Sequence, residues 1–331
     1  MPREVVNAGI LGVGFYVPDR VLTNAEMEQS LQTSSDWIYS RTGINERRIA
    51  APEQATSDLA VNAARQALEA ADTLPESVDL IIVATSTPDT VFPSTACLVQ
   101  EKLGVKKGVG AFDLAAACSG FVHALTVAGQ FVATGTCRRV LVIGAETMSR
   151  VVDWEDRGTA VLFGDGAGAV VVGPVAYDRG ILATKLYSDG AGGPHLLIPA
   201  SGSRRPASQD TLKERLHFVQ MNGREVFKFA VRIIVESFNE VTEAAGLKKE
   251  DIDVLALHQA NLRIIEPAAK RLGMPMEKVL INVDRYANTS SATIPIALAE
   301  AVQSGRIKAG DHVVMIGFGG GLAWGAAAVR W

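Results

Sequence analysis

The amino-acid sequence predicts an α/β protein in which one βαβ-rich unit occurs twice. Short, continuous apolar runs at residues 78–84, 140–144, 253–257 and 313–317 are typical of strands covered on both faces, and helical patterns lie between them. The first two runs match the last two at a spacing of roughly 170 residues, and helix-ending glycines recur at a similar spacing. We therefore expect two similar halves, residues 1–176 and 177–331.

The first half shows the following further elements. Apolar spacing and capping residues predict a strand within residues 5–17, a helix capped by Asn24, and helices over residues 57–71 and 94–103. The glycine cluster at 164–168 precedes a strand and no helix follows it, so we interpret it as close packing of a strand on backbone rather than a phosphate loop. The polar run at 41–48, with three arginines, is interpreted as a solvated loop.

The second half begins with irregular sequence. Residues 174–222 contain glycine-rich and proline-containing basic segments, so we expect a boundary and a surface excursion there. An amphipathic helix is predicted over residues 224–245, ended by Gly246. A mostly apolar helix over 292–305 precedes the strand at 313–317.

Composition limits the function classes. The 331-residue chain has a net charge of −4 and no apolar run long enough to span a bilayer, which argues against a nucleic-acid-binding or membrane protein. The N-terminal sequence lacks the features of a signal peptide. Three cysteines without CxxC spacing argue against disulfides and a zinc site. We expect a cytoplasmic enzyme without a metal.

Cys118 lies at the predicted start of a buried helix. Residues 121–134 are apolar almost all round, and Gly135 ends the pattern. The unpaired N–H groups and the dipole at a helix N-terminus favour an anion, which predicts a thiolate nucleophile at Cys118. A small packing residue is the alternative interpretation.

His258 and Asn288 are the candidate partners of Cys118. His258 directly follows the strand at 253–257, where an open α/β sheet presents side chains to a crevice. Asn288 lies 170 residues after Cys118, at the expected equivalent position of the second copy. A neutral histidine and an amide stabilise negative charge without a general base, which suits decarboxylation to an enolate beside an acyl-cysteine. Hydrolysis would need a base to activate water.

Two other classes share some of these features. A papain-like cysteine hydrolase has the same Cys, His, Asn order, but its signature around the cysteine is absent and the duplicated halves do not fit it. A non-catalytic acyl-binding protein would have no use for a thiol at a helix N-terminus.

Longer motifs resemble those of the β-ketoacyl-acyl-carrier-protein synthase III family of thiolase-superfamily condensing enzymes. They are AAACSG around Cys118, HQANLRII from His258, NTS from Asn288, FGDGAGA at 163–169, MNGREVFKFAV at 221–231 and FGGGLAWG at 318–325. Elongating synthases carry a second histidine where Asn288 stands, and thiolases have a second catalytic cysteine that is missing here. Ala287 stands where the family usually has glycine. The resemblance implies a thiolase-like duplicated fold, five layers αβαβα with two pseudo-twofold-related halves.

The resemblance also implies residue roles. Cys118 would be the nucleophile, His258 and Asn288 would bind the malonyl thioester carbonyl, and the N–H groups of Cys118 and Gly320 would form another oxyanion hole. Trp37 and Arg157 would sandwich the adenine of coenzyme A. The other implied residues are Arg41 and Asn261 for coenzyme A, Phe92, Leu114 and Phe318 for the acyl pocket, and Lys228, Arg263, Lys270 and Arg271 for an acidic carrier protein.

The implied activity is the initiating condensation of type II fatty acid synthesis. An acyl-CoA primer such as acetyl-CoA would condense with malonyl-acyl-carrier protein, giving a 3-oxoacyl-acyl-carrier protein, CO2 and CoA, with no cofactor besides the thioester substrate. The family implies a homodimer with Phe92 reaching toward its partner. Related enzymes that join two acyl-CoA molecules or prime a polyketide share these motifs, and the preferred primer stays open.

Overall fold

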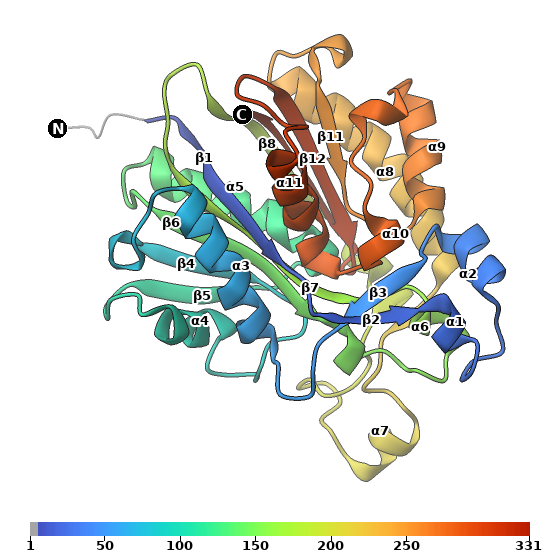
Figure 1. Cartoon of the computed structure of the whole chain (residues 1–331). Helices are drawn as coiled ribbons and strands as arrows, with labels where there is room; N and C mark the ends of the chain where they lie inside the picture. The colour runs from blue at the N-terminus through green and yellow to red at the C-terminus, as the bar shows by residue number, and fades with distance from the viewer. Residues whose placement is uncertain (1–5) are drawn as a thin grey trace.

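Two β-sheets and three layers of helices alternate across residues 6–331, the part of the chain that the computed structural model describes (Figure 1). The first sheet has the order β1 (Ala8–Tyr16), β7 (Asp165–Pro174), β6 (Val140–Thr147), β4 (Leu80–Ala84), β5 (Gly110–Leu114). The second sheet has the order β8 (Gly180–Ser188), β13 (Ala323–Arg330), β12 (His312–Gly319), β11 (Val254–Leu257).

The two sheets repeat one pattern of strand directions. In the first, β4 runs parallel to β6, while β7 is antiparallel to β6 and β1. In the second, β11 runs parallel to β12, while β13 is antiparallel to β12 and β8. An isolated parallel bridge between Leu255 and Val279 stands where β5 stands in the first sheet. The predicted duplication is therefore confirmed. The boundary between residues 176 and 177 falls between β7 and β8, and the division into two domains stays a prediction.

Helices cover both faces of both sheets. The outer helices are α3 (Thr56–Ala70) and α4 (Thr95–Leu103) on the first sheet, and α8 (Gly223–Ala244) and α9 (Leu262–Leu272) on the second. The central helices are α5 (Gly120–Ala133) and α11 (Thr293–Gln303). Side chains of α5 and α11 pack with strands of both sheets in one apolar core. This position between two sheets explains why residues 121–134 have almost no polar face.

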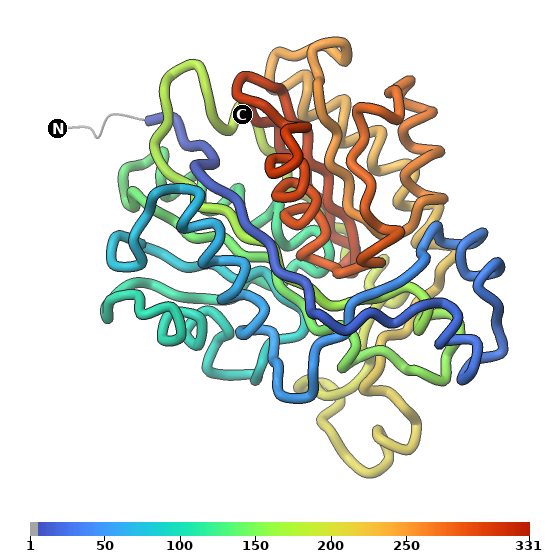
Figure 2. Tube along the Cα trace, viewed as in Figure 1, coloured from blue at the N-terminus to red at the C-terminus, as the bar shows by residue number. Residues whose placement is uncertain are grey.

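Short elements gather at one end of the sheets (Figure 1). Some of them contribute to the wall of the cavity described below. They are β2 (Arg20–Thr23), α1 (Asn24–Met27), α2 (Ser35–Thr42), β3 (Glu46–Ile49), α6 (Arg157–Ala160), β9 (Leu196–Leu197), α7 (Gln209–Lys213), β10 (Gln220–Met221) and α10 (Val283–Tyr286), with short 3₁₀ turns. The tube in Figure 2 shows the excursion around α7 projecting beyond this end.

Three local predictions are wrong. Arg47 is not in a solvated loop: it lies in β3, fully buried, and donates to Asn24 Oδ1 at 2.9 Å and to the carbonyl of Val161 at 3.0 Å. Thr23, not Asn24, caps α1 and forms a capping box with Glu26. The irregular stretch 174–222 contains the nine-residue strand β8. Its outward residues include apolar ones such as Leu182 and Leu186, which obscured the alternation expected of a strand.

The glycine cluster lies largely inside β7 rather than before it. A Cβ on Gly168 would lie 2.6 Å from the backbone nitrogen of Ile296 in α11. Glycine therefore lets the strand and the central helix approach closely, which confirms the packing interpretation.

Candidate active site

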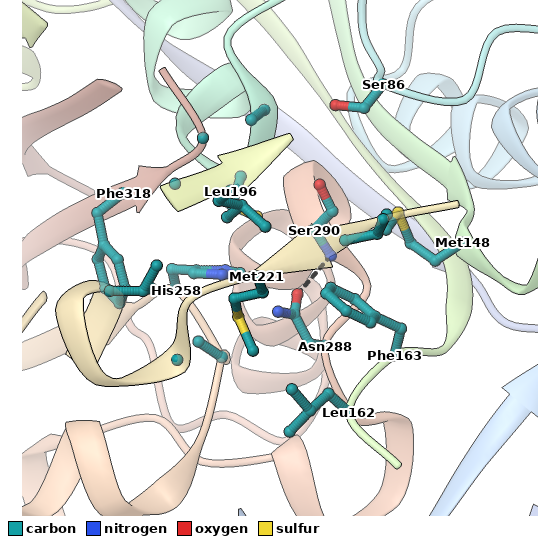
Figure 3. A pocket seen from close by; sticks show the side chains of 18 of the residues that line it. Ser86, Met148, Leu162, Phe163, Leu196, Met221, His258, Asn288, Ser290 and Phe318 are labelled. Carbon is teal, nitrogen blue, oxygen red and sulfur yellow. Dashed lines mark hydrogen bonds between the residues drawn. The ribbon is translucent and has the colours of Figure 1, made fainter. Parts of the chain in front are cut away.

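A cavity of about 390 Å³ opens where residues from the two sheets and their loops meet (Figure 3). Its wall contains Cys118, His258 and Asn288 together with Phe318 and Gly320. Cys118 comes from the turn before α5, His258 from the end of β11, and Asn288 from the segment before α11. The structure therefore brings together the three residues that the sequence singled out.

Cys118 lies in a 3₁₀ turn, Ala117–Ser119, directly before α5, and is 7% exposed. A Cβ on Gly319 would lie 3.2 Å from its Sγ, so β12 closes over the thiol. Burial raises the pKa of Cys118 to about 12; the carboxylate of Glu146 also raises it, and a hydrogen bond with Ser290 opposes the rise. Burial therefore favours the neutral thiol, and the resting thiolate expected at Cys118 stays a prediction.

Glu146 is a buried carboxylate that sequence reasoning missed. It accepts hydrogen bonds from Thr87 Oγ1 at 2.6 Å, from the backbone N–H of Ser86 at 3.0 Å, and from the hydroxyls of Ser290 and Ser291 at 3.0 and 2.9 Å. Burial raises its pKa. A polar residue two positions after the apolar run 140–144 was the available signal, similar to the one that identified His258. Glu146 joins the first sheet to the turn that follows Asn288.

His258 is 1% exposed, and its Nδ1 lies 2.7 Å from Thr293 Oγ1. The ring of Phe318 meets the imidazole edge to face, with centroids 5.1 Å apart. Burial lowers the pKa of His258 to about 3, so the ring is neutral near pH 7. This agrees with the expectation of a neutral donor.

Asn288 is fixed on three sides. Its Oδ1 accepts from the N–H of Ser290 at 2.8 Å (dashed in Figure 3), its N–H donates to Leu162 O, and its carbonyl accepts from Gly164 N–H. Because the amide oxygen is engaged, the Nδ2 donor is left for the cavity. The preceding Ala287 adopts φ 56° and ψ −156°, a conformation that favours glycine.

The predicted equivalence of Cys118 and Asn288 is not strict. Cys118 is the middle residue of the turn Ala117–Ser119, and the corresponding turn before α11 is Ser290–Ala292. Counted from these turns, Ser291 corresponds to Cys118, whereas counted back from the helix-ending Gly135 and Gly305, Asn288 corresponds to it. Asn288 reaches the cavity from two residues before its turn.

Three of the implied coenzyme A residues, Trp37, Arg41 and Arg157, lie on the short helices α2 and α6 at one end of the sheets. The guanidinium carbon of Arg157 is 4.6 Å from the ring centroid of Trp37, so the two side chains stack directly on each other. A base could enter between them only by displacing Arg157, which also donates to Gln32 O. Arg41 lies in α2, and its carbonyl accepts from Asn261 Nδ2 at 3.1 Å. Asn261 also caps α9 and lines the cavity.

Of the three implied acyl-pocket residues, only Phe318 lines this cavity. Phe92 is 84% exposed, and Leu114 packs against the central core. The apolar wall comes instead from residues that sequence reasoning left unassigned: Met148, Val151, Leu162, Phe163, Leu196, Ile198, Val219, Met221 and Phe227. Most of them come from the segments 148–163 and 196–221, whose irregular sequence gave no signal of their place.

The implied carrier-protein residues are exposed on neighbouring outer helices. Lys228 lies on α8 and pairs with Glu225 at 2.8 Å. Arg263 lies in the first turn of α9, and Lys270 and Arg271 lie in its last turn. Lys270 and Arg271 also complement the negative end of the α9 dipole.

Within residues 6–331, no cluster of three or more His, Cys, Asp or Glu side chains is arranged to hold a metal ion. The helices of this same range include none with the length and apolar content that a bilayer crossing requires.

Comparisons with known proteins extend these observations. The family model for 3-oxoacyl-[acyl-carrier-protein] synthase III matches residues 112–190, and the model for its C-terminal part matches residues 242–331. A β-ketoacyl-[acyl-carrier-protein] synthase III of Desulfitobacterium hafniense is 56% identical over 99% of this chain and 98% of its own. The crystal structure of 3-oxoacyl-[acyl-carrier-protein] synthase III from Aquifex aeolicus is 49% identical, with a TM-score of 0.91 over 98% of this chain and 100% of that one. The priming β-ketosynthase of the R1128 polyketide pathway is 38% identical, with a TM-score of 0.91 over 98% and 96%.

The duplicated five-layer fold and the buried Cys, His and Asn define a thiolase-like condensing enzyme, an acyltransferase. The chain belongs to the β-ketoacyl-acyl-carrier-protein synthase III family, whose members initiate type II fatty acid synthesis. Fold, family and enzyme class are therefore confirmed.

Proposed function

We propose that Cys118 accepts an acyl group from acyl-CoA and that His258 and Asn288 then direct the decarboxylation of malonyl-acyl-carrier protein. The observation that supports this most is the shared cavity: one buried thiol faces two neutral donors from the other half of the chain. No cofactor takes part, because the thioester bonds themselves supply the driving force.

The first half-reaction is a thioester exchange. Cys118 Sγ attacks the acyl carbonyl carbon, the bond to the coenzyme A sulfur breaks, and the proton of the thiol ends on that sulfur. The N–H groups of Cys118 and Gly320 stabilise the oxyanion that forms between these steps. Trp37, Arg41, Arg157 and Asn261 hold coenzyme A.

The second half-reaction makes the carbon–carbon bond. His258 and Asn288 donate to the malonyl thioester oxygen, so that loss of CO2 leaves an enolate with its charge on that oxygen. The enolate carbon attacks the acyl carbonyl on Cys118, and the sulfur leaves as a thiolate that takes up a proton from water to restore the thiol. The product is a 3-oxoacyl group on the carrier protein. The primer preferred by the apolar cavity stays open between straight, branched and longer acyl chains.

Two partners belong to the proposal. The exposed cations Lys228, Arg263, Lys270 and Arg271 suit an acidic carrier protein. A second copy of this chain suits the edge strand β5 and the exposed Val91 and Phe92, which are 89% and 84% accessible in a single copy. Phe92 would then bound the acyl pocket of the partner. Three cysteines without a disulfide suit the cytoplasm.

A panel of acyl-CoA thioesters with malonyl-carrier protein tests the proposal, with the products identified by mass. We expect an acylated Cys118 peptide and 3-oxoacyl-carrier protein for at least one primer. Condensation of two acyl-CoA molecules without carrier protein would contradict it. The likeness to a polyketide-priming synthase makes a product from that enzyme class the second outcome to look for.

A further inference from the structure

The tautomer of His258 decides whether it can serve as an oxyanion donor. A neutral imidazole carries one proton, and Nδ1 is the nitrogen that contacts Thr293. Nε2 is therefore the nitrogen available to the cavity, where the ring and the Asn288 amide point toward one another (Figure 3). Only the tautomer with the proton on Nε2 can donate to a thioester oxygen.

The Thr293 hydroxyl has one hydrogen and two neighbours. Its Oγ1 lies 2.7 Å from His258 Nδ1 and 3.0 Å from the carbonyl of Ser290. If the hydroxyl donated to Ser290, His258 would have to donate from Nδ1, and Nε2 would face the substrate with a lone pair. That lone pair would repel a developing oxyanion.

Backbone geometry leaves the Thr293 hydroxyl free to turn toward His258 Nδ1. The carbonyl of Ser290 already accepts the backbone N–H of Thr293. His258 Nδ1 has no other hydrogen-bond partner among the described residues, and the ring is 1% exposed, so water does not compete. Thr293 itself is 2% exposed. When the hydroxyl turns to Nδ1, the nearer of its two neighbours at 2.7 Å against 3.0 Å, the Ser290 carbonyl keeps the Thr293 N–H as its donor, so no buried group is left unpaired.

We propose that Thr293 is a positioning residue that donates its hydroxyl hydrogen to His258 Nδ1 and thereby fixes the proton on Nε2. This rests on the proposed donor role of His258. Edge-to-face packing by Phe318 holds the plane of the His258 ring. Packing does not distinguish the two tautomers, and the Thr293 hydroxyl selects between them.

The tautomer can be read directly. In ¹⁵N-histidine-labelled enzyme, we expect the His258 resonances of the wild type and of Thr293→Ser to show a protonated Nε2 and an unprotonated Nδ1. Thr293→Val, which keeps the shape and removes the hydroxyl, should show a mixture or the opposite tautomer. A protonated Nδ1 in the wild type would overturn the proposal, as would an unchanged spectrum in Thr293→Val.

Kinetics give the second readout. Thr293→Val should slow CO2 release from malonyl-carrier protein about tenfold to a hundredfold, the usual range for a lost orienting partner, while acylation of Cys118 changes less than about threefold. Thr293→Ser should recover most of the rate. Thr242→Val is the matched control, because Thr242 is also buried and bonds only to carbonyls of α8.

The outcomes separate this proposal from the role of His258. If His258→Ala decarboxylates normally, the proposed function fails, whatever the tautomer. If His258→Ala is impaired but Thr293→Val keeps the wild-type rate and spectrum, only the role of Thr293 is wrong.

Discussion

Individual residues divide the chemistry between the two halves of the chain. Cys118 stands before α5 and needs only an electrophile and a place for its proton. His258 and Asn288 approach from the second sheet and its loops, and their unpaired nitrogens line the cavity in which we propose that the substrate binds. Because different residues serve each half-reaction, single substitutions should separate them.

Asn288→Ala and His258→Ala should still accept an acyl group from acyl-CoA, at reduced rate, yet release little CO2. Loss of one oxyanion donor costs about a hundredfold to a thousandfold in rate. Mass shift of the protein measures acylation, and labelled CO2 measures decarboxylation. Cys118→Ala is the reciprocal control, with no acylation and slow decarboxylation. Acylation lost and decarboxylation kept in Asn288→Ala would reverse the assigned roles.

His258 also makes stability depend on pH. Its pKa is lowered from 6.5 to about 3 in the folded protein, so the unfolded chain binds a proton that the folded chain does not, and stability falls as pH drops from 6.5 toward 3. Between pH 7 and 5 this should remove about 2 kcal/mol of unfolding free energy. Urea unfolding at both pH values should show the loss in wild type and a smaller one in His258→Asn. His312→Asn, remote from the cavity, should keep the wild-type loss.

At the scale of elements, the segment between α10 and α11 is under backbone strain. Ala287 holds φ 56° and ψ −156° because its N–H bonds to Val283 while Asn288 is held on both sides by residues 162 and 164. A Cβ is unfavourable in this region, and the position of the neighbouring Asn288, a proposed oxyanion donor, depends on the conformation.

Ala287→Gly should therefore stabilise the protein, by about 1 kcal/mol after the greater freedom of glycine in the unfolded chain is offset. The urea midpoint measures this. Ala70→Gly, at the exposed end of α3, is the control and should destabilise by about 0.5–1 kcal/mol. Destabilisation by Ala287→Gly would show that the strain is absent.

Elements with one clear pattern were predictable, and those defined by distant partners were not. The run 121–134 gave α5 and its central place because two sheets demand an apolar surface all round. The charge of Arg47 indicated a surface residue, and only the fold reveals that Asn24 and the carbonyls of Leu22 and Val161 accept hydrogen bonds from its two terminal nitrogens inside the protein. The burial of Cys118 could not be predicted either, because its exposure to solvent depends on β12, which lies far along the chain.

At the scale of the whole molecule, the exposed cations of α8 and α9 form one candidate docking surface. Arg263→Glu should mainly raise the KM for malonyl-carrier protein and leave acyl transfer from coenzyme A largely intact. Added salt should weaken the wild type in the same way. Arg65→Glu on α3, an exposed arginine on the outer layer of the first sheet, is the control. Equal losses in both half-reactions would indicate a disturbed fold instead.

The architecture of the whole molecule was largely predictable because the sequence repeats its strand–helix unit. The three central site residues followed from polar side chains at the ends of apolar runs. The acyl cavity did not follow, since its wall comes from Met148, Phe163, Met221 and other residues in irregular segments. These residues come together only through the tertiary fold, which local sequence patterns do not predict.

The position of β8 has a consequence for how the protein is made on the ribosome. β8 pairs with β13 and, among the described strands, with no other in its sheet. A nascent chain therefore exposes β8 while nearly the whole second half is still being translated, and β12, which covers Cys118, also arrives late. Cys118, the proposed nucleophile, is synthesised early, but several of the residues that line its cavity, the proposed donors His258 and Asn288, and the strand that covers it come from the last third of the chain. Until that part of the chain is made, Cys118 lacks both the complete cavity and the two side chains with which we propose that it works.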